Sequence, residues 1–209
     1  MKRFDIITEA DARALDVGAS VQLNPGGHVT PLAADTLRAR RVTVVREAID
    51  DDLASLAPAA EIRRIAMGSD HSGVSLKRLL RDALRAQGLA VDDVGTEGTE
   101  PVDYPDIAAA VARLVTRGEA EAGIVIDGAG LGSAIAANKV PGIRAAMCND
   151  RTLARYAREH NGANVLTLGA TLVNADEAKA IVQTFLATPM REARYLRRLA
   201  KIRALERAR

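Results

Sequence analysis

The strongest constraint on the fold is a regular alternation that runs from about residue 62 to residue 188. Short apolar runs typical of strands are each followed by a longer segment with helical periodicity. In residues 73–88, for example, leucines and an alanine recur every three or four positions, and Gly88 ends the pattern. The expected strands lie at 63–70, 89–95, 122–127, 143–148 and 163–169. The expected helices lie at 73–88, 107–118, 150–162 and 175–188, with a small-residue helix after the glycines near 130 and an Arg-rich helix from about 191.

Five strand-then-helix units predict an α/β fold with a Rossmann-like or flavodoxin-like five-stranded parallel sheet covered by helices on both faces. Ligands of such sheets bind outside the carboxyl ends of the strands, near a switch in strand order. Three polar segments follow expected strands, so we expect them to share one edge of the sheet: Ser69–His71, Asp127–Ser133 and Asn149–Asp150.

Residues 1–60 follow a different pattern. Residues 21–45 suggest a turn, a short helix and a strand-like tail, and the acidic, Ala-rich stretch 46–60 suggests a linker or exposed helix. The sequence therefore predicts two parts, an N-terminal appendage with its linker (1–60) and the main α/β domain (61–209).

Composition narrows the class of protein. Hydrophobic residues make up 48% of the 209 residues but aromatic residues only 2%, which disfavours a protein that stacks nucleic-acid bases. The net charge is +2, and the Arg-rich end alone fits nucleic acid, an acidic membrane or a solvated helix face. The single cysteine, Cys148, is expected to be buried and inert, and it fits a reducing compartment. With no secretory signal and no membrane-length apolar run, we expect a cytoplasmic protein that binds neither nucleic acid nor membrane.

The segment Asp127–Ser133 (DGAGLGS) admits three interpretations. It resembles a dinucleotide fingerprint, with Asp150 about twenty positions on, but its spacing is G-x-G-x-G and it follows the third strand rather than the first. A plain structural turn explains the glycines but not the carboxylate of Asp127. The third interpretation is catalytic: the glycine backbone amides form an anion-holding nest, and the carboxylate removes a proton from carbon beside a carbonyl.

Five motifs together resemble the ribose-5-phosphate isomerase B family, which includes the galactose-6-phosphate isomerase subunits. They are GSDHSG (68–73), VDYPD (102–106), the loop and helix from Asp127, AREHNGANVLTLGA (157–170) and REARYLRRLAKI (191–202), and they span roughly residues 62–205. The resemblance implies aldose–ketose isomerisation of a sugar phosphate without metal or cofactor. It also implies a homodimer, or a tetramer, with active sites shared between subunits.

The resemblance assigns roles by position. Asp127 is the expected base and His160 opens the sugar ring. The backbone of Gly128, Ala129, Gly130, Leu131 and Gly132 forms the oxyanion nest. Substrate contacts are expected from Asp70, His71, Tyr104, Ser133 and Asn161. Arg194 and Arg198 are expected to clamp the phosphate of the partner subunit's substrate, and their four-residue spacing independently places them on one helical face. His28 matches no motif and is expected to be structural.

Four positions depart from the family pattern. Many members have cysteine in place of Asp127 and a hydroxyl residue in place of Ala129; an arginine is frequent at Thr171 and a histidine at Tyr195. A carboxylate is a chemically credible base, but the changes near the phosphate end widen the substrate class. Ribose 5-phosphate, a tetrose phosphate, a deoxy-sugar phosphate and a hexose phosphate are all candidates.

Two rival functions stay open at this point. One is a catalytically silent subunit that completes the site of a paralogue, and the other is a nucleotide-binding oxidoreductase. Residues 1–60 also resemble short segments of enzymes from bacterial microcompartments. That resemblance implies docking to a shell or partner enzyme, and a place inside such a compartment.

Overall fold

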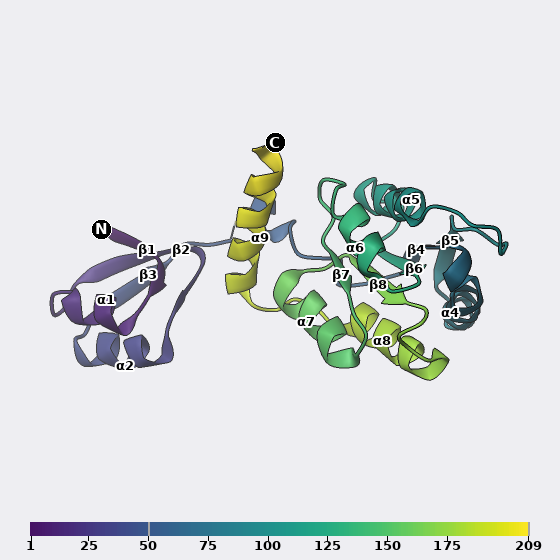
Figure 1. Ribbon diagram of the computed structural model, residues 1–209. Helices are drawn as coiled ribbons and strands as arrows, with labels where there is room; N and C mark the ends of the chain where they lie inside the picture. Colours follow the sequence, from purple (N-terminus) through teal and green to yellow (C-terminus); the bar gives the residue numbers. More distant parts are fainter. Residues whose placement is uncertain (50, 209) are drawn as a thin grey trace. The chain divides into compact units, whose positions relative to one another are not determined.

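The computed structural model describes residues 1–49 and 51–208 and divides them into two compact units (Figure 1). One unit comprises Met1–Ala57 together with Arg191–Leu205, and the other comprises Pro58–Met190 with the end of the chain from Glu206. The last helix, α9 (Ala193–Arg207), thus clusters for most of its length with the N-terminal segment, although the sequence motifs assign it to the isomerase.

The N-terminal unit is built on a three-stranded parallel sheet in the order β1-β2-β3. Its strands are β1 (Lys2–Ile7), β2 (Ser20–Val29) and β3 (Thr43–Arg46). Helices α1 (Glu9–Ala14) and α2 (Pro31–Ala39) connect them, and a four-residue helix, α3 (Asp51–Ala54), follows. The core contains Phe4, Ile7, Leu23 and Leu37.

The turn expected within residues 21–45 does not end a strand, because the Pro-Gly-Gly sequence lies inside β2, the central strand of the sheet. The Pro-Gly-Gly sequence produces an irregularity inside the strand instead. Gly26 has a φ of +67°, and the register between β1 and β2 shifts between Phe4 and Ile6. The residues on both sides of 24–27 pair with β1, so the turn signal produces a bulge within one strand.

The second unit contains a five-stranded parallel sheet in the order β5-β4-β6-β8-β7, which confirms the predicted fold class. Its elements in chain order are β4 (Arg64–Ser69), η1 (His71–Gly73), α4 (Val74–Ala86), β5 (Ala90–Asp93), α5 (Tyr104–Thr116), β6 (Ala122–Asp127), α6 (Leu131–Ala137), β7 (Ala145–Met147), α7 (Arg151–Asn161), β8 (Val165–Gly169) and α8 (Ala175–Ala187).

Two apolar layers enclose this sheet. Helices α4, α7 and α8 pack on one face, where Leu80, Ala154 and Phe185 are buried, and α5 and α6 cover the other face. The central strand β6 is buried along its whole length, and its side chains alternate between the two layers. Because parallel strands share one direction, all five carboxyl ends lie at the same edge. None of the described helices has the length and apolar character needed to cross a membrane.

Candidate active site

The candidate site begins at the switch in strand order, where the first strand of the unit, β4, has β5 on one side and β6 on the other. The carboxyl ends of β4 and β6 meet there, and the Asp70 amide donates to the carbonyl of Ile126 at 3.2 Å. Asp70 therefore follows β4, Asp127 is the last residue of the adjacent strand β6, and the two are only 7% and 4% exposed. The structure thus brings together two of the predicted site residues at the predicted edge.

Asp127 is held by four hydrogen bonds from its own loop. Its Oδ1 accepts from the amides of Ala129, at 2.8 Å, and Gly130, and its Oδ2 accepts from the amide and hydroxyl of Ser133, at 2.9 and 2.5 Å. Ser133 is completely buried. Two of the five amides expected to form the nest therefore bind the carboxylate itself, and the amides of Leu131 and Gly132 open α6, where helix geometry gives them no carbonyl partner.

The shape of the glycine loop is fixed from β8 and the residues after it. Gly130 has a φ of +76°, and a Cβ there would lie 2.9 Å from the carbonyl carbon of Leu168. Thr167 Oγ1 donates to the Gly130 carbonyl at 2.7 Å, and Thr171 Oγ1 donates to the Gly128 carbonyl at 2.6 Å. Thr171, where the family often has an arginine, is therefore a tether for the loop in this chain.

The neighbouring substrate-contact candidates lie around this loop. Tyr104, the first residue of α5, lies directly against Gly132, where any side chain would overlap its ring. The amide of Val102 donates to Nδ1 of His71 at 3.4 Å, an arrangement that leaves the proton of a neutral imidazole on Nε2. Asp70 accepts three hydrogen bonds from Ser72 and Gly73 through Oδ1, and among the described residues no bond reaches its Oδ2.

His160 and Asn161 lie at the other edge of the sheet. Helix α7 starts at the carboxyl end of β7 and ends at Asn161, next to the amino end of β8. The residues that follow confirm this position, because Arg144, which precedes β7, binds the carbonyl of Gly162 at 2.7 Å and the side chain of Asn164 at 2.8 Å. Within one chain, the His160 imidazole and the Asp127 carboxylate are therefore at opposite ends of the strands. His160 stacks on Tyr156, with the ring centroids 4.6 Å apart.

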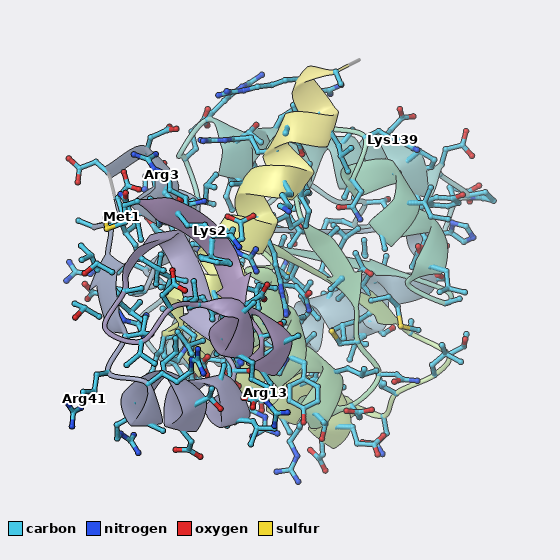
Figure 2. The ribbon with its side chains drawn as sticks, turned by 90° about the vertical axis from the view of Figure 1, so that its left-hand side faces the viewer. Met1, Lys2, Arg3, Arg13, Arg41 and Lys139 are labelled. Atoms are coloured by element: carbon cyan, nitrogen blue, oxygen red, sulfur yellow. The ribbon has the colours of Figure 1, made fainter. Side chains whose placement is uncertain are left out.

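Arg194 and Arg198 both lie on α9, in the N-terminal unit. Arg198 is exposed, and the Arg194 side chain is 38% exposed with its Nε 2.6 Å from Oε2 of Glu192. The ring of Tyr195 lies beneath both guanidinium groups. Other basic side chains of this unit, Lys2, Arg3, Arg13 and Arg41, are exposed and labelled in Figure 2.

Sequence reasoning missed the roles of Ser72 and Lys77. Ser72 donates its hydroxyl to Asp70 at 2.5 Å, and the only signal for it was its position inside the GSDHSG motif. Lys77 is fully buried and binds Asp93 at 2.8 Å, the Thr96 carbonyl at 2.7 Å and Glu97 at 3.1 Å. Its position on the apolar face of a helix gave no sign that it would fasten the loop after β5.

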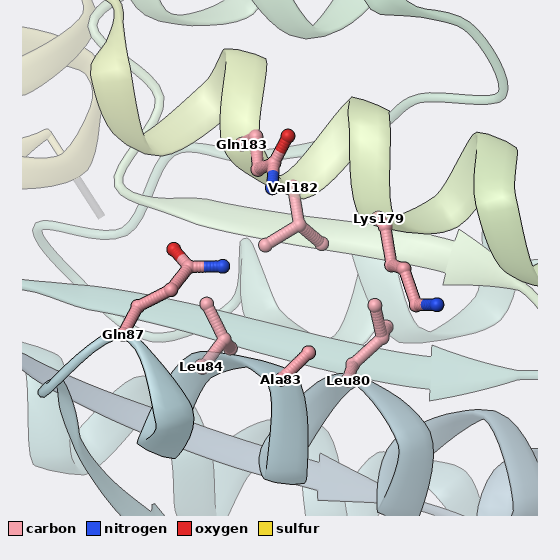
Figure 3. Close-up of a pocket in the computed structure, with 7 residues that line it drawn as sticks. All are labelled: Leu80, Ala83, Leu84, Gln87, Lys179, Val182 and Gln183. Carbon is pink, nitrogen blue, oxygen red and sulfur yellow. The ribbon is translucent and has the colours of Figure 1, made fainter.

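Two other features carry no catalytic chemistry. Cys148 is buried, as expected, and burial raises the pKa of its thiol to about 12, which keeps it protonated. A groove of about 200 Å³ between α4 and α8 is lined mostly by Leu80, Ala83, Leu84 and Val182, with Lys179 as its one ionisable side chain (Figure 3).

Among residues 1–49 and 51–208, no three His, Cys, Asp or Glu side chains gather as a metal site would require.

Comparison with known proteins agrees with the geometry. Residues 65–202 match the family described as Ribose/Galactose Isomerase. The chain is 40% identical to ribose-5-phosphate isomerase B of Escherichia coli K12 over 148 residues, which are 71% of this chain and 99% of that protein. It is also 40% identical over 124 residues to a D-erythrulose-4-phosphate isomerase of Pectobacterium atrosepticum, covering 58% of this chain and 81% of that one.

Solved structures show the same likeness. Ribose-5-phosphate isomerase B of Clostridium thermocellum superposes with a TM-score of 0.69 and 50% identity, covering 69% of this chain and 98% of that one. The type B enzyme of Trypanosoma cruzi gives a TM-score of 0.68 and 40% identity, covering 70% and 100%. The chain therefore belongs to the ribose/galactose isomerase family and is an aldose–ketose sugar-phosphate isomerase of the ribose-5-phosphate isomerase B type.

Proposed function

We propose that this chain interconverts the aldose and ketose forms of a four- or five-carbon sugar phosphate through a cis-enediolate, with Asp127 as the base. The observation that carries the proposal is the Asp127 carboxylate at the end of β6, inside a loop whose amides point toward it. A carboxylate and backbone donors in one loop are what proton transfer beside a carbonyl requires.

The four hydrogen bonds of Asp127 suggest how the step proceeds. While the carboxylate accepts from Ala129, Gly130 and Ser133, its lone pairs are occupied. We propose that the carbonyl oxygen at C1 of the substrate takes over amides of the Gly128–Gly132 nest. Asp127 is then released to remove the C2 proton, and the electron pair moves through C1–C2 to oxygen O1. Return of the proton to C1, with transfer of the O2 hydroxyl proton to O1, gives the ketose.

The other site residues take supporting roles in this proposal. The Oδ2 of Asp70, which accepts no hydrogen bond from the described residues, and the Nε2–H of His71 bind substrate hydroxyls, and Tyr104 closes the loop side of the site. His160 opens the ring, Asn161 binds a hydroxyl, and Arg194 with Arg198 binds the phosphate. Because His160 lies at the far edge of the sheet from Asp127, we propose that it serves the site of a second copy, in a homodimer or a tetramer with shared sites.

The tetrose class enters because the Pectobacterium relative is named for a four-carbon substrate and the phosphate-end departures, Thr171 and Tyr195, allow a substrate other than ribose 5-phosphate. A panel of C4, C5 and C6 aldose phosphates, with C2-proton exchange followed in D₂O, tests the proposal. We expect turnover of a C4 or C5 substrate with exchange. Activity on C6 substrates alone, or turnover without exchange, would contradict it.

A second candidate, a catalytically silent subunit that completes a paralogue's site, is favoured by the fully hydrogen-bonded state of Asp127. Protein that is inactive alone on the whole panel, and active only after mixing with a paralogue, would support this role. Docking of residues 1–60 to a microcompartment shell or partner enzyme stays a prediction.

A further inference from the structure

The helix that carries Arg194 and Arg198 is fastened to the N-terminal sheet at its first turn. Gly26 of β2 has a φ of +67°, and a Cβ there would lie 2.6 Å from the Ala193 carbonyl oxygen and 3.1 Å from Cβ of Arg197. Only glycine allows this approach, since any side chain would force the strand and helix apart. The contact therefore fixes the start of α9, at the residue directly before Arg194.

The next turn is fastened by Asp5 of β1. Its Oδ2 lies 3.4 Å from Nη1 of Arg197 and 4.0 Å from Nζ of Lys201, and Asn24 donates to its Oδ1 at 3.1 Å. The hydrogen bond from Asn24 and the charge of Arg197 lower the pKa of Asp5 against the effect of burial. The Arg197 side chain is only 13% exposed. Arg197 is thus part of the connection between helix and sheet.

Helix geometry separates this fastened face from the face of the two arginines. At about 100° per residue, positions 193 and 197 lie on one side and positions 194 and 198 lie about 100° further round. On the arginine side, the ring centroid of Tyr195 is 4.9 Å from Cζ of Arg194 and 5.6 Å from Cζ of Arg198. The Tyr195 hydroxyl also accepts from Nη2 of Arg194 at 3.0 Å, and the residue is 5% exposed.

We propose that the N-terminal unit is a brace for the phosphate-binding helix, in which Asp5 and Tyr195 are positioning residues that preset Arg194 and Arg198 to bind the phosphate of the substrate. Long arginine side chains lose rotamer freedom on binding, so holding them in place beforehand raises affinity. Glu192 competes for Arg194, so an anion must match the geometry of the pair to displace it. This inference rests on the proposed role of the two arginines.

The test uses the full chain with four variants: Asp5→Asn, Asp5→Glu, Tyr195→Leu and the matched control Asp35→Asn. Asp35 is an exposed carboxylate of the same unit, 3.3 Å from Arg38. Calorimetry measures the Kd for inorganic phosphate. Steady-state kinetics measure KM and kcat separately, on the sugar phosphate of the panel that the wild type converts fastest. We expect Asp5→Asn and Tyr195→Leu to raise both Kd and KM about fivefold, with kcat within about twofold. Asp5→Glu and Asp35→Asn should stay close to the wild type.

Unchanged phosphate Kd in folded Asp5→Asn and Tyr195→Leu overturns the brace, as does a fall in kcat with no change in Kd. If circular dichroism shows that one of these two variants does not fold, the phosphate Kd of the other variant tests the proposal. Tyr195→Phe is a milder change at the second position, because it removes only the hydroxyl. The proposed function fails separately. Wild type without isomerase activity contradicts that function, whereas the phosphate Kd does not depend on turnover and still tests the brace.

Discussion

The two ends of the proposed site are built in opposite ways. Asp127 is 4% exposed, and its carboxylate accepts hydrogen bonds from Ala129, Gly130 and Ser133, all within the next six residues of the chain. Arg194 and Arg198 are half-exposed and exposed, and the helix that carries them is fastened by Asp5 and Gly26 from the other end of the chain. The hydrogen-bond donors of the carboxylate thus come from its own loop, whereas the helix of the arginines is held by residues far away in the chain.

This difference separates chemistry from recognition. A base must hold one atom within hydrogen-bond reach of the substrate, and the seven-residue loop supplies the donors that hold the Asp127 carboxylate, with Thr167 and Thr171 fixing the loop itself. A phosphate clamp needs charge and reach, which exposed guanidinium groups supply once their helix is held. We therefore expect changes in the loop to act on kcat and stability, and changes on α9 to act on KM.

The largest expected effect is that of Asp127→Asn. The substitution removes the proposed base and turns an NH₂ toward donors from Gly130 or Ser133, so kcat should fall about 10³-fold while phosphate Kd is unchanged. Ser133→Ala is the control, because it removes the hydroxyl donor but keeps the carboxylate. C2-proton exchange in D₂O measures both. Exchange near the wild-type rate in Asp127→Asn would show that another group moves the proton.

At the proposed phosphate-binding end, Arg198→Ala should raise KM and phosphate Kd by about 10- to 100-fold, with a small change in kcat. This is the usual cost of losing a charge-assisted contact. Arg207→Ala, an exposed arginine in the last turn of the same helix, is the control. Equal effects of the two variants would mean that α9 attracts phosphate only through its total charge.

The stability of variants at two glycines tests how tightly the Asp127–Ser133 loop packs against β8. Gly130 and Gly118 have similar φ values, +76° and +71°, but only Gly130 is crowded, with Leu168 and Gly169 backbone within 3.0 Å of an added Cβ. Gly118→Ala should cost about 1 kcal/mol of unfolding free energy, and Gly130→Ala about 2 kcal/mol or more. Urea unfolding measures both. Equal costs would mean that the loop moves easily away from β8.

A smaller effect of opposite sign is expected for Glu192→Gln. This change removes the carboxylate 2.6 Å from Nε of Arg194, so phosphate should bind about threefold more tightly. The salt dependence of the phosphate Kd, measured in parallel, should steepen. Weaker phosphate binding would show that Glu192 orients Arg194 more than it competes for it.

The smallest expected effect is on the unfolding free energy at low pH. It concerns Glu97, a carboxylate that belongs to neither end of the proposed site. Hydrogen bonds from Lys77, then from Arg78, lower the pKa of Glu97 to about 2 from 4.5. Because the folded-state pKa is depressed, its contribution is present above pH 4.5 and is lost as the pH falls toward 2. The unfolding free energies of the wild type and Glu97→Gln should therefore differ above pH 4.5 and converge near pH 2. A constant difference would contradict the assignment.

Much of the isomerase domain could be predicted because its signals are local. The alternation of residues 62–188 gave the five strands and the edge where Asp70 and Asp127 meet, since parallel strands place all their carboxyl ends together. Its limits were approximate: α5 begins at Tyr104 rather than at 107, because Pro105 suits the first turn of a helix.

Where partners lie far apart in the chain, the sequence alone was insufficient. The Pro-Gly-Gly segment of β2 resembles a turn, but the residues before and after it both pair with β1, so it forms an irregularity inside a strand. The motifs assign His160 to the same active site as Asp127. The direction of α7, however, places His160 at the opposite edge of the sheet within one chain.

By itself, then, the sequence determined the fold class, the family and the carboxylate at the end of β6, because periodicity and motif spacing are properties of neighbouring residues. Only the tertiary structure decided that Asp127 is bound by its own glycine loop and that α9 is joined to the N-terminal sheet. Both outcomes depend on which hydrogen-bond donors and charges come within reach once the backbone has folded, and spacing along the chain does not encode that.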